Sequence, residues 1–349
     1  MSGGIAQLVA VGAQDAHLVG QPEVSFFRSN YKRHTNFAQT VERQVIQGNP
    51  SSGGMSTVRF ERKGDMVGYV YIAPHDGTQA VNFSPTDWVT AISKVELLIG
   101  GQVIDEQTSE FSQYIAPSVL AQNLTKSTSG FAEAGESKFY PLRFSFCENA
   151  QSAIPLIALQ YHDVELRITW GTLSTEKYEV YSQFIHLDTD ERTVLSSTPQ
   201  QMLITQTQKA IASASKIQEL NFNHPIKCLV AADGTSLAIA AVANKMKLQI
   251  NGTDVADFKY VDPHYTAVTS YYHTTSSKDA GAAGANEKFF LYPFCLDTCK
   301  VQPTGSLNFS RLDSARLVND TANSDADIYA VNYNVLRIEN GMGGLMYSN

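Results

Sequence analysis

Two stretches of the sequence repeat one order of features, and this internal repeat limits the choice of fold more than any single motif does. Val95–Asp105 (VELLIGGQVID) and Met246–Asp257 (MKLQINGTDVAD) each read as a strand, a two-residue turn and a second strand, and they begin 151 residues apart. Gly100-Gly101 and Asn251-Gly252 supply the positive φ angles that a tight hairpin turn requires. A repeat of this period predicts two copies of one structural unit within the 349 residues.

The features that flank the two hairpins recur in the same order. Lys138-Phe139 and Lys288-Phe289 follow the hairpins 150 residues apart, and Tyr178–Leu187 matches Tyr329–Ile338 at a distance of 151. Between the two copies, Asp188–Pro199 (DTDERTVLSSTP) is polar and ends in Ser-Thr-Pro, as expected of a connector. The sequence therefore predicts two tandem units of ~150 residues each, which is an ordinary domain length.

Hydrophobic periodicity assigns both units to the all-β class. Within the predicted strand Ala158–Trp170, apolar and polar residues alternate from Val164 onwards, which is typical of a half-buried strand. Only Ser109–Leu120 and Pro263–Tyr272 are predicted to be helical. About eight short strands per unit favour a jelly roll over an immunoglobulin-type sandwich. The predicted fold is a double jelly roll: two tandem eight-stranded antiparallel β-sandwiches with a few short helices in the loops.

Charge and cysteine content limit the binding partners that the protein can have and the cellular compartment in which it is made. With 26 basic and 34 acidic residues the chain carries a net charge of −8, which disfavours wholesale binding to nucleic acid or to an anionic membrane. The four cysteines are too few and too scattered for a disulfide framework, so we expect buried free thiols. The first residues lack the features of a secretory signal, and no window approaches ~18 apolar residues. These features predict a soluble protein made inside the cell.

No catalytic constellation stands out, and we expect neither an enzyme nor a bound cofactor or metal. The sequence lacks the nucleophile elbow, the phosphate-binding loop and the HExxH motif, and its eight histidines never form His-x-His. A metal site built from distant histidines is an unsupported alternative. His162-Asp163 is interpreted as a structural pair in the middle of a strand. Asp188, Asp190 and Glu191 carry oxygen ligands that Ca²⁺ prefers, but a solvated acidic connector is the favoured interpretation.

One basic stretch with interleaved aromatic character, Arg28–His34 (RSNYKRH), remains to be explained. Contact with nucleic acid is one interpretation. Contact with protein is favoured, because one short patch in an acidic chain releases few counterions.

This stretch lies within Leu8–Phe37, which resembles the N-terminal signature of the major capsid proteins of nucleocytoplasmic large DNA viruses. The elements of that signature are found here as Gly12–Asp15, Leu18–Pro22, Phe26-Phe27 and Arg33–Phe37. Further segments similar to the family are Ile157–Leu166, Leu187–Arg192, Leu220–Ile226, Gln302–Arg311 and Asn332–Asn349. The similarity therefore extends from residue 8 to the last residue.

The resemblance implies a fold that agrees with the repeat, and a structural function. Three chains of the family associate so that six jelly rolls form a pseudo-hexagonal capsomer, or hexon, and the capsomers tile an icosahedral shell around a double-stranded DNA genome. By resemblance, the protein is a homotrimer in the virion, assembled in the host cell cytoplasm. Its implied partners are neighbouring capsomers and minor capsid and penton proteins. The resemblance also implies proximity to an inner membrane without insertion, and no sequence-specific binding of nucleic acid.

The resemblance also implies a domain layout and candidate assembly contacts. Residues 1–24 would form an arm at the base of the capsomer, 25–192 the first jelly roll, 193–199 a linker and 200–349 the second jelly roll. The candidate contacts beneath the capsomer are Phe26, Phe27, Tyr31, Arg33 and His34.

Three alternatives remain open at this point. The resemblance implies long insertions on the outer surface, whereas the loops of this chain are short, with Thr125–Ser137 and Ser276–Glu287 among the longest. The short loops predict a plain outer face. They also leave a minor capsid paralogue of the same fold as an alternative. A carbohydrate-binding or attachment module requires an exposed aromatic platform, so Trp88 and Trp170 would have to be exposed, and we expect Trp170 to be buried. A glycoside hydrolase requires paired carboxylates, and no pair stands out.

Overall fold

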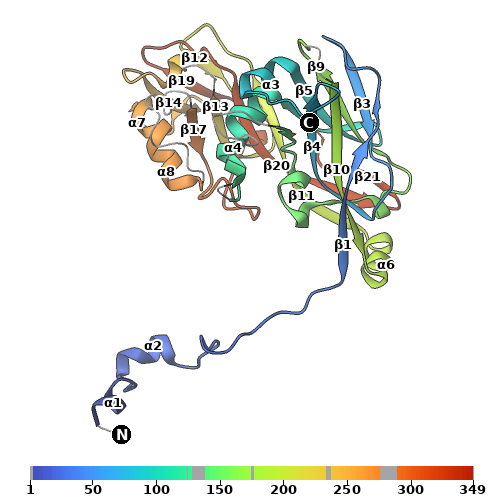
Figure 1. Cartoon of the computed structure of the whole chain (residues 1–349). Helices are drawn as coiled ribbons and strands as arrows, with labels where there is room; N and C mark the ends of the chain where they lie inside the picture. The colour runs from blue at the N-terminus through green and yellow to red at the C-terminus, as the bar shows by residue number, and fades with distance from the viewer. Residues whose placement is uncertain are drawn as a thin grey trace. The chain divides into compact units, whose positions relative to one another are not determined.

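The computed structural model describes residues 3–123, 125–127, 138–173, 177–232, 237–275 and 289–348. The chain divides into two compact units, Met1–Asn36 and Phe37–Asn349. The described part of the first unit contains three short helical turns, α1 (Gly3–Gln7), η1 (Ala13–Asp15) and α2 (Ala16–Val19). Asp15 caps the first residues of η1, because its Oδ2 accepts a hydrogen bond from the Gly12 N–H at 2.7 Å. The described sheets all lie in the second unit (Figure 1).

The first half of the second unit is a sandwich of two antiparallel sheets, which we call sandwich 1. One sheet has the strand order β1 (Phe37–Gln44), β10 (Lys177–Leu187), β4 (Met66–His75) and β7 (Tyr140–Pro141), with β8 (Ile154–Pro155) also paired to β4. The facing sheet has the order β2 (Ile46–Gln47), β3 (Met55–Arg59), β9 (Val164–Trp170), β5 (Ile92–Ile99) and β6 (Gln102–Thr108). The apolar side chains between the two sheets form one continuous core.

The second half of the same unit is another sandwich, sandwich 2. Its first sheet has the order β11 (Gln200–Ala210), β20 (Ile328–Glu339), β13 (Pro225–Ala232) and β17 (Phe289–Pro293), with β18 (Leu307–Asn308) on β13 and β21 (Met342–Leu345) on β20. Its second sheet has the order β12 (Ile217–Glu219), β19 (Ala315–Asn319), β14 (Lys245–Ile250) and β15 (Thr253–Asp254), with β16 (Lys259–Tyr260) on β14. A second core fills the space between these sheets.

The two sandwiches have the same topology. The order β1-β10-β4-β7 of sandwich 1 corresponds, strand for strand along the chain, to β11-β20-β13-β17 of sandwich 2. Likewise, β3-β9-β5-β6 corresponds to β12-β19-β14-β15. The repeat read from the sequence is therefore a repeat of structure, with four strands per sheet along these paths, as the prediction of tandem eight-stranded sandwiches requires.

The hairpins that revealed the repeat have the turns that their sequences predict. Gly100 and Gly101 have φ angles of 59° and 83°, and Asn251 and Gly252 have 48° and 78°. Positive φ at both central residues is the conformation that matches the twist of a two-residue hairpin. The predicted alternation in β9 is also confirmed, because its residues are alternately buried and half-buried along Val164–Trp170.

Both predicted helices are present, and they share an irregularity. Residues 109–120 contain a π-helical turn, η2 (Phe111–Ile115), followed by α4 (Ala116–Val119). Residues 261–273 contain α7 (Val261–Pro263), the π-helical turn η8 (His264–Val268) and α8 (Thr269–His273). The π turns begin 153 residues apart, so they occupy the same place in the two repeats.

Two further helices were not predicted from the sequence. In α3 (Pro85–Ala91), Ser84 and Asp87 form a reciprocal capping box, with the Asp87 N–H donating to Ser84 Oγ at 3.2 Å and the Ser84 N–H donating to Asp87 Oδ2 at 2.8 Å. The connector between the sandwiches contains α6 (Thr189–Ser197). Other short turns are η3 (Thr125–Ser127), α5 (Ser145–Glu148), η5 (Ala150–Ser152), η6 (Leu156–Ala158), η7 (Ala238–Ala240) and η10 (Phe309–Arg311).

The described helices are all too short, or too polar, to cross a membrane. Of the two loops expected to be among the longest, Ser276–Glu287 lies outside the described residues, and only residues 125–127 of the other are described. His162-Asp163 lies just before β9 and not in the middle of a strand, because the chain forms η6 up to Ala158 and begins the strand only at Val164.

Candidate assembly surfaces

A helix of sandwich 1 joins the two sandwiches by packing on the outer face of a sheet of sandwich 2. Phe111, Ile115 and Val119, on one stripe of η2 and α4, are fully buried. They form a third apolar cluster, which we call the junction cluster, together with side chains of β13, β17 and β20. Figure 1 shows α4 between the strands of the two sandwiches. The junction is thus a packed interface within one chain.

Polar groups fix the register of this junction. The Tyr329 hydroxyl of β20 donates to Glu110 Oε2 at 3.1 Å and lies 2.8 Å from Thr108 Oγ1. The Thr207 N–H of β11 donates to Asp105 Oδ1 of β6 at 2.8 Å. Burial raises the pKa of Asp105 to about 7, although hydrogen bonds from Thr207, Gln107 and Glu106 favour its charged form. A buried carboxyl therefore lies directly on the contact between the sandwiches.

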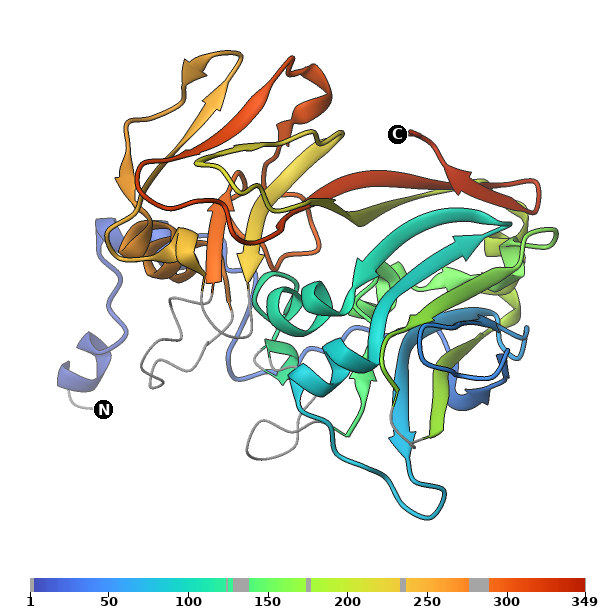
Figure 2. The ribbon, with the colours of Figure 1, turned by 90° about the horizontal axis from the view of Figure 1, so that it is seen from above.

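The C-terminal hairpin ties sandwich 2 to sandwich 1 a second time. Ile204 of β11 and Leu336 and Ile338 of β20 belong to the core of sandwich 1. Beyond them, the Gly343 carbonyl of β21 lies 2.9 Å from His162 Nδ1, and the Tyr161 N–H donates to the Gly341 carbonyl at 2.9 Å. Figure 2 shows β20 and β21, in red, reaching across to the strands of sandwich 1. The sandwiches are therefore interlocked.

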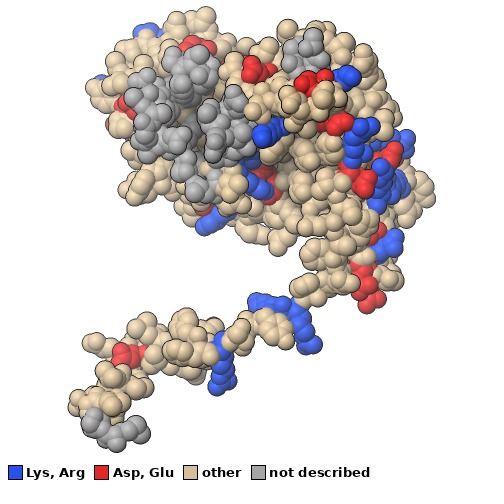
Figure 3. Space-filling view, in the orientation of Figure 1, with Lys and Arg blue, Asp and Glu red and all other residues tan. Residues whose placement is uncertain are grey.

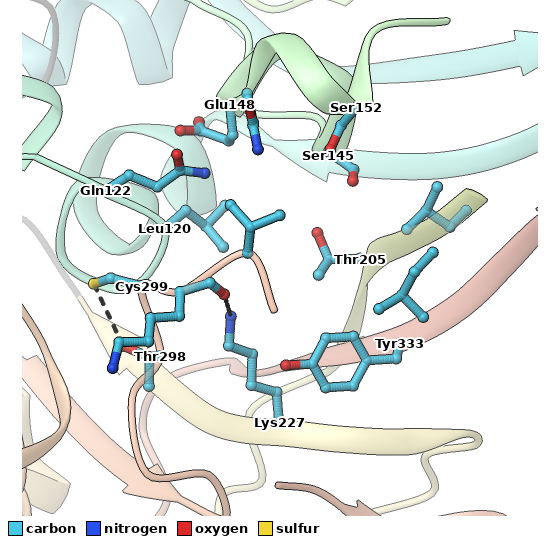
Figure 4. A pocket seen from close by; sticks show the side chains of 15 residues that line it. Leu120, Gln122, Ser145, Glu148, Ser152, Thr205, Lys227, Thr298, Cys299 and Tyr333 are labelled. Carbon is cyan, nitrogen blue, oxygen red and sulfur yellow. Dashed lines mark hydrogen bonds between the residues drawn. The ribbon is translucent and has the colours of Figure 1, made fainter. Parts of the chain in front are cut away.

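A small cavity at the junction is not a substrate pocket. It measures about 50 Å³ and is lined from both sandwiches, by Leu120, Thr205, Lys227 and Tyr333 among others (Figure 4). Lys227 is almost fully buried, with Nζ 3.5 Å from the Lys300 carbonyl and 5.8 Å from the centre of the Tyr333 ring. A space of this size holds a few water molecules, whereas ligand pockets measure roughly 300–1,000 Å³.

The cysteines and the acidic connector are structural. Cys228, Cys295 and Cys299 are buried free thiols, as predicted, while Cys147 is half-buried. Burial raises the pKa of the Cys228 thiol, which makes it unreactive. Asp188 caps α6 by accepting a hydrogen bond from the Thr189 N–H at 2.8 Å. The described residues include no group of three or more His, Cys, Asp or Glu side chains placed to hold a metal ion.

The predicted contact residues lie in the first unit and are exposed. Phe26, Phe27 and Tyr31 are 93%, 98% and 84% exposed, and Arg33 is exposed as well. His34 is also exposed, and its Nδ1 lies 2.7 Å from the Thr35 carbonyl. The structure does not bring these five residues into one cluster. Figure 3 shows basic side chains, in blue, along this segment. Such a run of exposed apolar and basic side chains is typical of a segment that binds another protein.

A second exposed apolar surface, missed by the sequence analysis, lies on the outer face of the β10-β4-β7 strands. Tyr69, Tyr71, Phe139 and Pro141 line it together with charged residues that include Lys126 and Lys138, and we call this surface the aromatic groove; it encloses about 640 Å³. The Tyr71 ring stacks on Tyr181 at 5.2 Å and meets Phe139 edge-on at 5.6 Å. The alternation of tyrosines in GYVYIA (residues 68–73) was the available signal, because it gives the strand two apolar faces.

Tyr181, which stacks on Tyr71 of the groove, is held in place by polar groups. The Tyr181 hydroxyl donates to Glu179 Oε2 at 2.7 Å, and Arg43 Nη1 donates to Glu179 Oε1 at 2.7 Å. The hydrogen bond from Tyr181 lowers the pKa of Glu179, so this carboxylate stays charged near neutral pH.

A third exposed apolar surface lies on residues 264–273 of sandwich 2, which we call the tyrosine helix. Val268, Tyr271 and Tyr272 are exposed there, and the two tyrosine rings pack edge-on at 5.0 Å.

Both tryptophans of the chain are buried: Trp88 is 0% and Trp170 is 1% exposed. The exposed tryptophan platform required by the carbohydrate-binding alternative is therefore absent.

Comparison with known proteins gives matches along the whole second unit. A family profile described as "Major capsid protein N-terminus" matches residues 25–231, and one described as "Large eukaryotic DNA virus major capsid protein" matches residues 231–344. The major capsid protein of Pyramimonas orientalis virus is 34% identical over 399 aligned positions, and that of Paramecium bursaria Chlorella virus 1 is 30% identical over 447. Both alignments cover 100% of this chain and of the relative.

Solved structures agree with the sequence matches. The chain resembles the VP54 protein of PBCV-1, solved as a crystal structure fitted into a reconstruction of the virophage Sputnik, with a TM-score of 0.77 and 25% identity. That match covers 93% of this chain and 100% of the other. The Faustovirus major capsid protein shares the fold, with a TM-score of 0.64 at 10% identity. These matches confirm the predicted double jelly roll.

Proposed function

Because the chain belongs to the family of major capsid proteins of large eukaryotic DNA viruses, it is a structural protein of the virion capsid, and we propose that it assembles as a homotrimeric, pseudo-hexagonal capsomer. One observation carries the proposal: the chain holds two interlocked sandwiches of identical strand order. Three such chains in a ring present six similar units, and closed cyclic rings are the common form of homo-oligomers. Such capsomers can tile a flat face without six separate subunits.

We also propose the domain layout, the contact residues and the place of assembly that the family resemblance implies. Residues 25–192 and 200–349 are the two jelly rolls, 193–199 is the linker, and residues 1–24 form an arm at the base of the capsomer. Phe26, Phe27, Tyr31, Arg33 and His34 contact minor capsid proteins there, and the exposure of the three aromatic rings supports this role. Assembly takes place in the host cell cytoplasm, next to penton proteins and near an inner membrane that the chain does not enter.

A second candidate is a minor capsid paralogue of the same fold. The alignment with the Pyramimonas orientalis virus protein runs over 399 positions, 50 more than this chain has residues, so the relative carries segments that have no counterpart here. The shorter loops leave open a minor paralogue that occupies a special position in the shell. Quantification of the chain in purified virions distinguishes the two, since the major protein is the most abundant one in the capsid.

The native mass of the purified protein, measured by light scattering, tests the capsomer. We expect a stable species of three times 38.2 kDa, because the exposed apolar surfaces of the monomer are buried on association. A monomer of 38.2 kDa that does not associate at high concentration would contradict the proposal.

A further inference from the structure

The junction within the chain has an exposed counterpart on the helix of sandwich 2. In sandwich 1, Phe111, Ile115 and Val119 form the stripe that enters the junction cluster. When the two π turns are superposed in sequence, 153 residues apart, the corresponding stripe is His264, Val268 and Tyr272 of the tyrosine helix. Ile115 and Val119 are fully buried, whereas Val268 is 37% and Tyr272 is 71% exposed. The same helix stripe is therefore covered in one repeat and uncovered in the other.

The sheet that receives this helix has an exposed counterpart as well. In the junction, Cys228 of β13 pairs with Val331 of β20 and Pro293 of β17. In sandwich 1, Tyr71 of β4 pairs with Tyr181 of β10 and Pro141 of β7. The strands correspond one to one, so the aromatic groove occupies the position on sandwich 1 that receives the helix on sandwich 2.

We infer that the tyrosine helix of one copy docks in the aromatic groove of the next copy, repeating between chains the contact that joins the sandwiches within a chain. This inference rests on the proposed self-assembly and names its surfaces. The contact is heterologous, because each copy offers its helix to one neighbour and its groove to the other, and such a contact closes into a ring when the rotation permits. Tyrosines on both sides provide the large buried aromatic anchors that dominate interface energies.

Two variants remove one surface each. In the helix variant, Val268→Asp and Tyr272→Asp place carboxylates on the docking stripe; in the groove variant, Tyr71→Asp and Phe139→Asp place them in the groove. The matched control is Val194→Asp, which changes a valine of α6 that is 60% exposed and lies on neither surface. We expect the control to keep the mass of the wild-type assembly, and each double variant to fall to 38.2 kDa.

Mixing the two variants tests the direction of the contact. The helix variant retains its groove and the groove variant retains its helix, so an equimolar mixture has one intact contact and should form a dimer of twice 38.2 kDa. Formation of this dimer also shows that both variants are folded. Two variants that stay monomeric when mixed, although each has the circular dichroism spectrum and thermal midpoint of a folded protein, would overturn the inference.

The remaining outcomes separate this inference from the proposed capsomer. If the wild type is a trimer and both variants stay trimers, the proposed capsomer is supported, and the inference that these two surfaces form its contact is wrong. If the wild type is a monomer, the proposed capsomer is wrong, and so is the inferred docking between copies. If the groove variant stays trimeric but loses binding to a glycan array that the wild type binds, the groove is a sugar site and the inference is overturned.

Discussion

At the residue scale, Asp105 connects the protonation state of the protein to the contact between its sandwiches. Burial raises its pKa from 3.8 to about 7, so the folded protein binds this proton more tightly than the unfolded chain does. The stabilisation from the bound proton is therefore present below about pH 4 and is lost as the pH rises to about 7. The loss amounts to at most about 1.4 kcal/mol per pH unit within that window.

Asp105→Asn removes this titration and keeps an oxygen that can accept the Thr207 N–H. We expect the free energy of unfolding of the wild type to fall relative to that of the variant as the pH rises from about 4 to about 7. Urea unfolding of both proteins at the two ends of this window measures the difference. If the difference in free energy of unfolding between the two proteins is the same at both pH values, Asp105 does not titrate in this window.

Gly100 and Gly101 make a matched pair for a test of the hairpin turn. Both have positive φ, which costs an alanine about 1–2 kcal/mol. A Cβ at Gly100 would also lie 2.4 Å from His162 Nδ1, whereas a Cβ at Gly101 meets nothing within 4 Å. His162 is held by the Gly343 carbonyl, so we expect Gly100→Ala to lose about 1–3 kcal/mol more than Gly101→Ala. Equal losses in thermal unfolding would show that the His162 ring moves aside freely.

At the element scale, the segment around Phe26 and Phe27 should affect assembly without affecting the fold. Both rings are more than nine-tenths exposed, so Phe26→Ser with Phe27→Ser should leave the thermal midpoint and the native mass unchanged. The same change should weaken co-sedimentation with minor capsid proteins of the virus. Ile211→Ser, at another exposed apolar residue, is the control. A fall in native mass would place these rings in the capsomer itself.

Elements with strong local signals were predictable, and those defined by distant contacts were not. The hairpin glycines and the alternation of β9 depend on neighbouring residues, and both were predicted correctly. The capping box of α3 was a missed local signal, since Ser84 and Asp87 have the required spacing. The aromatic groove needed knowledge of the sheet, because Tyr71 and Tyr181 are 110 residues apart in sequence and stack only once β4 and β10 pair.

At the scale of the whole molecule, the repeat predicted the two sandwiches but not how they join. The join depends on which stripe of residues 109–120 is buried, and the sequence of that helix is apolar on several sides. It also depends on where the last residues of β20 lie, because Leu336 and Ile338 of this strand enter the core of the other sandwich. Both features concern contacts between halves, for which a single sequence carries no periodic signal.

The shared core also sets an order of events during synthesis. Sandwich 1 is synthesised before sandwich 2, yet its interior is filled in part by Leu336 and Ile338, which belong to β20 of sandwich 2. At roughly 5–20 residues per second, about 150 residues separate the end of β10 from these side chains, a delay on the order of ten seconds. During that interval the nascent first half has an open apolar interior. The core of sandwich 1 therefore closes only after β20, the strand that supplies Leu336 and Ile338, has been made.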